Sequence, residues 1–277
     1  MTLLDCITAL EAGRRLHVCV HDVSGILEHP VFALDFGHRM HDMSFCDEAK
    51  RTPAGYALCM RHKERANALG VRHGKPFCGY CPFGLYEIAY PVVIKGKTAC
   101  ILYVGNLCPS RETARERIRK SAPQTGADTT ALTAFLDDCE AGNDATFLPV
   151  AKLLATFIVN TAETMRLPSG GQEHWAVKQA LQYLERYYAK DIRVTAMAAL
   201  CNVHPQYFGR LFKQHTGQSF TTYLTALRMQ HAARRLQNGD AVADTAAACG
   251  YVDVPYFSRV FRREFGVSPA QYKKQHT

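Results

Sequence analysis

The chain of 277 residues is 47% hydrophobic and 21% charged, which excludes disordered and fibrous proteins. Its length exceeds that of a usual single core, so we expect two domains. Its net charge of +8 is uneven, because residues 1–167 hold 19 Lys+Arg against 18 Asp+Glu, whereas residues 168–277 hold 14 against 7. A basic excess confined to the last part is typical of a module that binds phosphate groups.

The N-terminal region shows no targeting pattern. Asp5 and Glu11 stand where a signal peptide would be basic and then apolar, and no uninterrupted apolar run approaches the roughly 18 residues of a membrane span. We therefore expect a cytoplasmic protein with no membrane partner. Eleven cysteines at uneven spacing then predict thiols or metal ligands rather than a disulfide framework.

Short β-like runs and longer periodic runs alternate in the first 167 residues. Strands are expected at 16–20, 32–36, 88–94 and 98–105. The turn residues Lys95-Gly96-Lys97 join the last two runs into a predicted hairpin. Helices are expected at 48–70, 110–121, 129–140 and 147–166. This pattern predicts an α+β domain in which helices pack on a modest antiparallel sheet.

Four cysteines of this domain form a group with metal-ligand character: Cys46, Cys59, Cys78 and Cys81. The last two make a CxxC turn, which places two thiolates on one side of a tight loop, as half of a tetrahedral site requires. Zinc is the first candidate cofactor, and an iron–sulfur cluster is the second. Nearby histidines are substitute ligands: His41, His62 and His73. A set of reduced cysteines without metal stays open beside these interpretations.

A break in the pattern follows the helix predicted at 147–166. Leu167-Pro168-Ser169-Gly170-Gly171 interrupts two helical stretches with a proline, a serine and two glycines. We therefore predict a first domain at 1–167, a linker at 168–172 and a second, helical domain at 173–277.

The second domain contains an internal repeat. Residues 194–223 recur 49 positions later as residues 243–272, with ten of thirty aligned positions identical. Each copy reads as an alanine-rich helix, a short turn and a second helix, which is helix-turn-helix geometry. Phe208 and Phe212, one helical turn apart, are expected to pack on the first helix. Gly217 and Gly266 are expected to end the second helices.

The opposite face of each second helix is left free by this packing. It carries Gln206, Gly209, Arg210 and Lys213 in the first copy, and Pro255, Ser258, Arg259 and Arg262 in the second. A helical run at 220–237 separates the copies and would span roughly 27 Å. The two second helices could therefore enter successive major grooves of double-stranded DNA from one side.

The second domain resembles the DNA-binding domain of AraC-family transcription regulators. The resemblance is carried by Gly250-Tyr251, Tyr256-Phe257-Ser258-Arg259-Val260-Phe261-Arg262-Arg263, Gly266-Val267-Ser268-Pro269 and Tyr272. It implies an all-α fold with two helix-turn-helix units, and it adds Val254 to the residues that face DNA. Gly209 departs from the pattern because it has no side chain to read a base. Sequence readout is therefore expected to rest on Gln206 and Arg210, with more phosphate contacts from the second copy.

The first domain resembles the PocR sensory domain. The resemblance is carried by Phe45-Cys46, Cys59, the run from Cys78 to Val92, Gly96 and Gly105-Asn106-Leu107. It implies a PAS-like sensor of small hydrocarbon derivatives such as diols. Three residues are candidates for lining its pocket: Tyr86, Glu87 and Tyr90. Asn106 stands where the family commonly has glutamine.

These observations favour a transcription regulator controlled by a small-molecule effector. By the family resemblance, activation is favoured over repression, and promoter DNA, RNA polymerase and a second copy of the chain are the expected partners. A second interpretation makes the four cysteines a metal or redox sensor. A third is an enzyme, a repair protein of the Ada type that takes methyl groups from DNA, but Cys46 and Cys59 are too far apart for that pattern. We therefore expect no catalytic residues.

Overall fold

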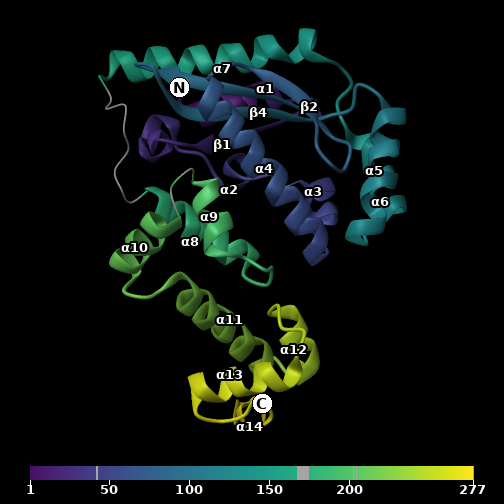
Figure 1. Ribbon diagram of the computed structural model, residues 1–277, viewed down its shortest axis with the longest axis vertical. Coiled ribbons are helices and arrows are strands. Elements are labelled where there is room, and N and C mark those ends of the chain that lie inside the picture. Colours follow the sequence, from purple (N-terminus) through teal and green to yellow (C-terminus); the bar gives the residue numbers. More distant parts are fainter. Residues whose placement is uncertain (42, 167–174, 202, 204, 277) are drawn as a thin grey trace. The chain divides into compact units, whose positions relative to one another are not determined.

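The computed structural model describes residues 1–41, 43–166, 175–201, 203 and 205–276 (Figure 1). The chain divides into two compact units. The first comprises Met1–Trp175 with Ala199–Val203, and the second comprises Ala176–Ala198 with His204–Thr277. The linker expected at 168–172 lies outside the described residues.

A four-stranded antiparallel sheet forms the centre of the first unit. Its strands are β1 (His17–Asp22), β2 (Phe77–Tyr80), β3 (Tyr86–Ile94) and β4 (Lys97–Leu107), in the order β1-β4-β3-β2. The predicted β3–β4 hairpin is confirmed: Ile94 pairs with Lys97 across a turn in which Lys95 and Gly96 both have positive φ. A two-residue turn of this kind matches the twist of paired strands.

Helices surround this sheet at both faces and at one end. Their bounds are α1 (Leu3–Glu11), α2 (Phe36–Arg39), α3 (Ser44–Ala49), α4 (Pro53–His73), α5 (Arg111–Thr125), α6 (Thr129–Phe135) and α7 (Asp144–Thr164). Three short 3₁₀ helices lie at Ile26–Glu28, Pro30–Phe32 and Leu136–Asp138. The expected α+β architecture is thereby confirmed for this unit.

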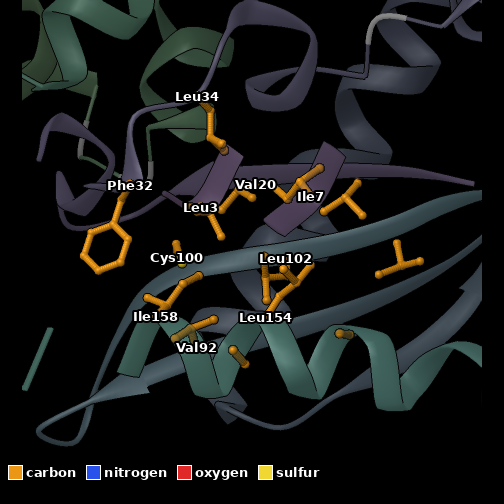
Figure 2. Packing of buried hydrophobic residues seen from close by; sticks show 14 of the residues in the cluster. Leu3, Ile7, Val20, Phe32, Leu34, Val92, Cys100, Leu102, Leu154 and Ile158 are labelled. Carbon is orange, nitrogen blue, oxygen red and sulfur yellow. The ribbon is translucent and has the colours of Figure 1, made fainter. Parts of the chain in front are cut away.

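The main hydrophobic core lies between the sheet and helices α1 and α7 (Figure 2). Val20 from β1, Val92 from β3 and Leu102 from β4 meet Leu154 and Ile158 from α7. By length and composition alone, α7 could cross a membrane. Packing against the sheet accounts for its apolar character, because one side of the helix is buried in this core.

The opposite face of the sheet is covered by α4. Cys19, Ala89, Ile101 and Tyr103 form a smaller cluster there, against which Ala66 of α4 packs. Alternation along the strands explains this division, since successive side chains point to opposite faces. A further cluster joins α3, α5 and α6 to the segment between β2 and β3.

Two local predictions are wrong. The run at 32–36 is not a strand: a 3₁₀ helix ends at Phe32, and Asp35 caps α2 by accepting a hydrogen bond from the His38 N–H. The CxxC segment was predicted to form a tight turn, but its first cysteine, Cys78, lies in strand β2 and pairs with Ile88 of β3. Pairing to a neighbouring strand extends the backbone there.

The second unit is all helical, as expected. Its helices are α8 (Trp175–Tyr187), α9 (Val194–Leu200), α10 (Pro205–Thr216), α11 (Phe220–Gln237), α12 (Val242–Ala248), α13 (Val254–Phe265) and α14 (Pro269–His276). The bounds of α11 coincide with the helical run predicted between the two copies. Gly217 follows α10 and Gly266 caps α13, both with positive φ.

Equivalent aromatic residues of the two copies make equivalent contacts. The Phe208 and Phe212 rings lie 5.8 Å apart, as do those of Phe257 and Phe261. The Phe212–Tyr223 separation of 5.5 Å likewise matches the 5.4 Å between Phe261 and Tyr272. The identities between the copies therefore preserve a core, as predicted for Phe208 and Phe212, which are both fully buried.

Candidate functional site

A cavity of about 250 Å³ opens between α4 and the sheet of the first unit. Three buried sheet residues form part of its lining: Glu87, Ala89 and Tyr103. Exposed Arg65 and Leu69 of α4 and Gly79 of β2 also line it, so the cavity is open to solvent. Pockets for drug-sized ligands measure roughly 300–1,000 Å³. This one therefore suits a molecule of few heavy atoms.

A buried ion pair stands at the edge of this cavity. The Nζ of Lys63 lies 2.7 Å from Oε2 of Glu87, and the side chains are 7% and 10% exposed. The other carboxylate oxygen lies 3.1 Å from Nδ1 of His41. The ammonium group of Lys63 also stands 4.0 Å from the ring centroid of Tyr103. Since a buried charge is tolerated only when it is paired, these contacts hold Glu87 in place.

The ionisation of this network follows from its contacts. Burial alone would raise the pKa of Glu87, but the charge of Lys63 and contacts with His41 hold it well below its usual range. Burial and the charge of Lys63 lower the pKa of His41 to about 4. At neutral pH the cavity therefore offers an ionised carboxylate, which the neutral imidazole of His41 contacts from outside the lining.

The sheet separates the three residues predicted to line the ligand pocket. Glu87 lies on the cavity face, whereas Tyr86 and Tyr90, its neighbours in the alternating pattern, pack against the core shared with α7. The Tyr86 hydroxyl donates a hydrogen bond to the carboxylate of Asp144. Asn106 does not line this cavity either, because its amide group donates to the carbonyl oxygens of Arg15 and Asp138.

The four-cysteine group is also divided. Cys46, Cys59 and Cys81 pack on the cluster formed with α5 and α6, whereas Cys78 packs on the core shared with α7. Burial raises the pKa of the Cys81 thiol to about 12 and that of Cys78 to about 11. The described residues contain two groups of three potential metal ligands in which the ligand atoms lie within 4.8 Å of one another. Neither group contains Cys46, Cys59, Cys78 or Cys81.

The first of the two faces predicted to contact DNA lies on α10. Phe208, Leu211 and Phe212 are buried on one side of this helix. Gln206, Arg210 and Lys213 are exposed, and Gly209 is partly exposed with open space where a Cβ would stand. The helix is therefore amphipathic with a basic, solvent-facing side.

The second face predicted to contact DNA lies on α13. Phe257, Val260 and Phe261 are buried, while Pro255, Arg259 and Arg262 are exposed and Val254 and Ser258 are partly exposed. Asp253 caps the helix by accepting a hydrogen bond from the Tyr256 N–H. The preceding turn is tight: Gly250 has φ +81°, and a Cβ there would stand 2.3 Å from the carbonyl oxygen of Ala189. The turn before α13 therefore packs directly against the backbone that follows α8.

Family comparisons match both units. A model of the sensory domain found in PocR matches residues 36–165, and a model of a helix-turn-helix domain of the AraC type matches residues 197–275. The chain is therefore an AraC-type DNA-binding transcription regulator with a PocR sensory domain. The sensory match contains α4, the sheet strands β2, β3 and β4, and the whole lining of the cavity.

The curated relatives that match this chain are also named as regulators. The regulatory protein PocR of Salmonella typhimurium is 26% identical over 249 residues, which are 83% of this chain and 82% of that protein. The transcriptional activator RhaS of Pectobacterium carotovorum is 33% identical over 108 residues, 39% of either chain. Among solved structures, the C-terminal domain of AraT, a response regulator from Geobacillus stearothermophilus, is 35% identical with a TM-score of 0.35, covering 36% of this chain and 84% of that one.

Several polar residues of the sensory domain were missed from the sequence. Lys63 pairs with Glu87, and Tyr103 contacts both Lys63 and Asn67. Lys63 and Asn67 lie on α4 and Tyr103 lies on β4, so no single stretch of the sequence contains them. The spacing of Lys63 and Asn67, one helical turn apart on an otherwise apolar side of α4, is the signal that could have indicated them.

Proposed function

We propose that the regulator is controlled by a small polar effector bound in the cavity between α4 and the sheet. The observation that carries the proposal is the buried carboxylate of Glu87, which Lys63 and His41 fix in position in the lining of a largely apolar cavity. Its oxygens have lone pairs beyond those engaged by Lys63 and His41. A hydroxyl of the effector would donate to one of them, and the carbon chain would lie on Ala66 and Ala89.

The chemistry of this cavity suits the diols that the family resemblance implies. A diol has two donors and a short apolar backbone, and it adds no charge beside the Lys63–Glu87 pair, whose charges already balance. His62 and Arg65, which also line the cavity, can donate to the second hydroxyl. The PAS-like assignment of this domain belongs to the same proposal.

In the second unit we propose that α10 and α13 bind successive major grooves of promoter DNA. Arg210 and Gln206 would read bases, while Lys213, Arg259 and Arg262 would contact phosphates. Activation is proposed over repression, since RhaS is named as an activator. RNA polymerase, a second copy of the chain and a cytoplasmic location belong to this proposal.

Calorimetric titration of the full chain with propane-1,2-diol and glycerol tests the effector site. A Cβ at Gly79 meets nothing within 4 Å, so Gly79→Leu narrows the cavity without a backbone clash. We expect binding to weaken at least about 10-fold in this variant, which corresponds to about 1.4 kcal/mol. Val93→Leu, on β3 outside the cavity lining, is the matched control and should leave binding unchanged.

Equal affinity of Gly79→Leu and the unchanged protein would place the effector elsewhere. Absence of binding by any short polyol would refute the diol proposal. Neither result would affect the assignment of the chain as a DNA-binding regulator.

A metal or redox input at the four-cysteine group is the second candidate. Cys46, Cys59 and Cys81 share one cluster, which favours it, and the placement of Cys78 on another core disfavours four-thiolate coordination. Metal content of a Cys78→Ser/Cys81→Ser variant tests it. Methyl transfer from DNA to a cysteine, followed by mass spectrometry, tests the Ada-type activity.

A further inference from the structure

Three potential metal ligands lie close together on the face of the sheet that α4 covers. Cys19 and His21 are alternate residues of β1, so they point to one face, and His41 approaches them from the segment after α2. One ligand atom from each of the three lies within 4.8 Å of the other two. All three side chains are buried, with exposures of 1%, 4% and 8%.

The hydrogen bonds of the two imidazoles define which nitrogen is available. His41 directs Nδ1 to the carboxylate of Glu87 at 3.1 Å, and His21 directs Nδ1 to Oδ1 of Asn67 at 3.0 Å. The Asn67 oxygen also accepts from the Tyr103 hydroxyl at 2.7 Å. Both contacts favour the tautomer with a proton on Nδ1, so the lone pair of each ring lies on Nε2. Histidines that bind metals are oriented by this kind of contact.

One of these Nε2 atoms is buried without a partner. Among the described residues, nothing forms a hydrogen bond with Nε2 of His41. A buried polar atom without a hydrogen-bond partner is rare in native structures, so the position of this atom calls for a ligand. A metal ion between His41, His21 and Cys19 would satisfy it.

We propose that Cys19, His21 and His41 form a binding site for a metal ion that prefers sulfur and nitrogen ligands, either Zn²⁺ or Cu⁺. Donor atoms around such an ion lie roughly 3.3–3.8 Å apart, so small side-chain rotations from the observed arrangement close the site. On binding, a metal–sulfur bond forms, the Cys19 S–H bond breaks and the proton leaves to solvent. Neutral imidazoles and one thiolate balance the charge of Cu⁺, whereas Zn²⁺ would add a fourth ligand such as water.

Metal titration of the full chain tests the site without reference to the effector. Chelator-treated protein is titrated anaerobically with Co²⁺, as a spectroscopic probe for the zinc site, and with Cu⁺ against a competing chelator. We expect one ion per chain and, for Co²⁺, a thiolate-to-metal charge-transfer band. In Cys19→Ala the band should disappear and affinity should fall more than about 100-fold.

Two controls separate this site from other thiols. Cys100→Ala removes a fully buried cysteine of β4 that lies on the opposite face of the sheet, and it should leave metal binding unchanged. Cys78→Ser/Cys81→Ser should also retain the ion. If circular dichroism shows that Cys19→Ala does not fold, His41→Gln provides the second variant, with the same expected loss of affinity.

The proposal is overturned by three results. These are no ion bound by the unchanged protein, equal affinity in the folded Cys19→Ala or His41→Gln variant, and loss of the ion in Cys78→Ser/Cys81→Ser instead. The last result would assign the metal to the four-cysteine group.

Discussion

The cation at the cavity of the sensory domain and the cations on the helices predicted to contact DNA lie in opposite environments. Lys63 is 5% exposed and paired with a carboxylate, whereas Arg210 and Arg259 are exposed on helices whose other side is apolar. A buried charge is useful where its partner must stay in one position, as Glu87 does at the cavity. An exposed one keeps its donors for a partner that arrives from solution. The contrast teaches that a cationic side chain can hold a pocket in place when it is buried, whereas the exposed arginines are available for the proposed contacts with DNA.

The largest effect is expected from breaking the buried pair. Lys63→Met leaves the Glu87 carboxylate buried without its cation, which should cost about 3–5 kcal/mol of stability. The double variant Lys63→Met/Glu87→Leu should recover at least half of that loss, because it removes the orphaned charge. Urea denaturation measures both.

The matched control for this prediction is Arg262→Ala on the exposed face of α13, which should change stability by less than about 0.5 kcal/mol. A Lys63→Met variant as stable as Arg262→Ala would show that burial of the pair is not maintained in solution.

A second contrast compares two glycines of the DNA-binding unit. Gly250→Ala adds a Cβ 2.3 Å from the Ala189 carbonyl oxygen at a positive φ, and should destabilise this unit by about 2–4 kcal/mol. Gly209→Ala enters open space on α10 and should stabilise it by about 0.5–1 kcal/mol. Thermal denaturation distinguishes the two, and equal shifts would contradict the tight turn before α13.

The exposed arginines should affect DNA binding rather than stability. If Arg210 reads a base, Arg210→Ala weakens binding to a specific site by about 1–3 kcal/mol, with a smaller loss on random DNA. If Arg259 contacts phosphate, Arg259→Ala weakens both to the same extent. Gel-shift titrations on the two DNAs measure this, and equal losses for Arg210→Ala would refute base reading.

The smallest expected effect on stability concerns His38, which is neither as deeply buried as Lys63 nor exposed like the arginines of α10 and α13. Hydrogen bonding to Glu11 raises the pKa of His38, whose side chain is 15% exposed. A raised histidine pKa stabilises the fold below pH 6.5, and this stabilisation is lost as the pH rises through the raised value. The stability difference between the unchanged protein and Glu11→Gln should therefore shrink by about 0.5–1 kcal/mol above pH 6.5.

Urea denaturation at pH 6.0 and 8.5 measures this shrinkage. Glu116→Gln, which removes an exposed pair with Lys120, is the control and should give the same difference at both values. A constant difference for Glu11→Gln would contradict the charged His38–Glu11 contact.

Much of the fold could be predicted because local patterns agree with the tertiary structure. The repeat at 194–223 and 243–272 predicted both helix-turn-helix copies, since its identities include packed phenylalanines and the glycines that end the second helices. The β3–β4 hairpin followed from its turn. The run at 32–36 misled because strand propensity there is overridden by Pro30 and by the Asp35 cap.

The sensory site was less predictable because its parts meet only through the sheet. Glu87 could be proposed from a short stretch, but its partners Lys63 and His41 come from α4 and the segment after α2. Successive residues of a strand point to opposite faces, so Tyr86 and Glu87 lie on different sides of the sheet. The prediction grouped them because they are neighbours in the sequence. The exposure of Gln206, Arg210 and Arg259 was predictable because the hydrophobic pattern of a helix shows which side is buried, and their contact with DNA stays a prediction.

The most direct measurement is the affinity of the full chain for a DNA site selected from random duplexes, with and without propane-1,2-diol. The account predicts recovery of a discrete sequence and a change of about 5- to 150-fold in Kd on adding the diol, which Gly79→Leu abolishes. An identical Kd with and without diol, in protein that binds the selected site, would contradict control through this cavity.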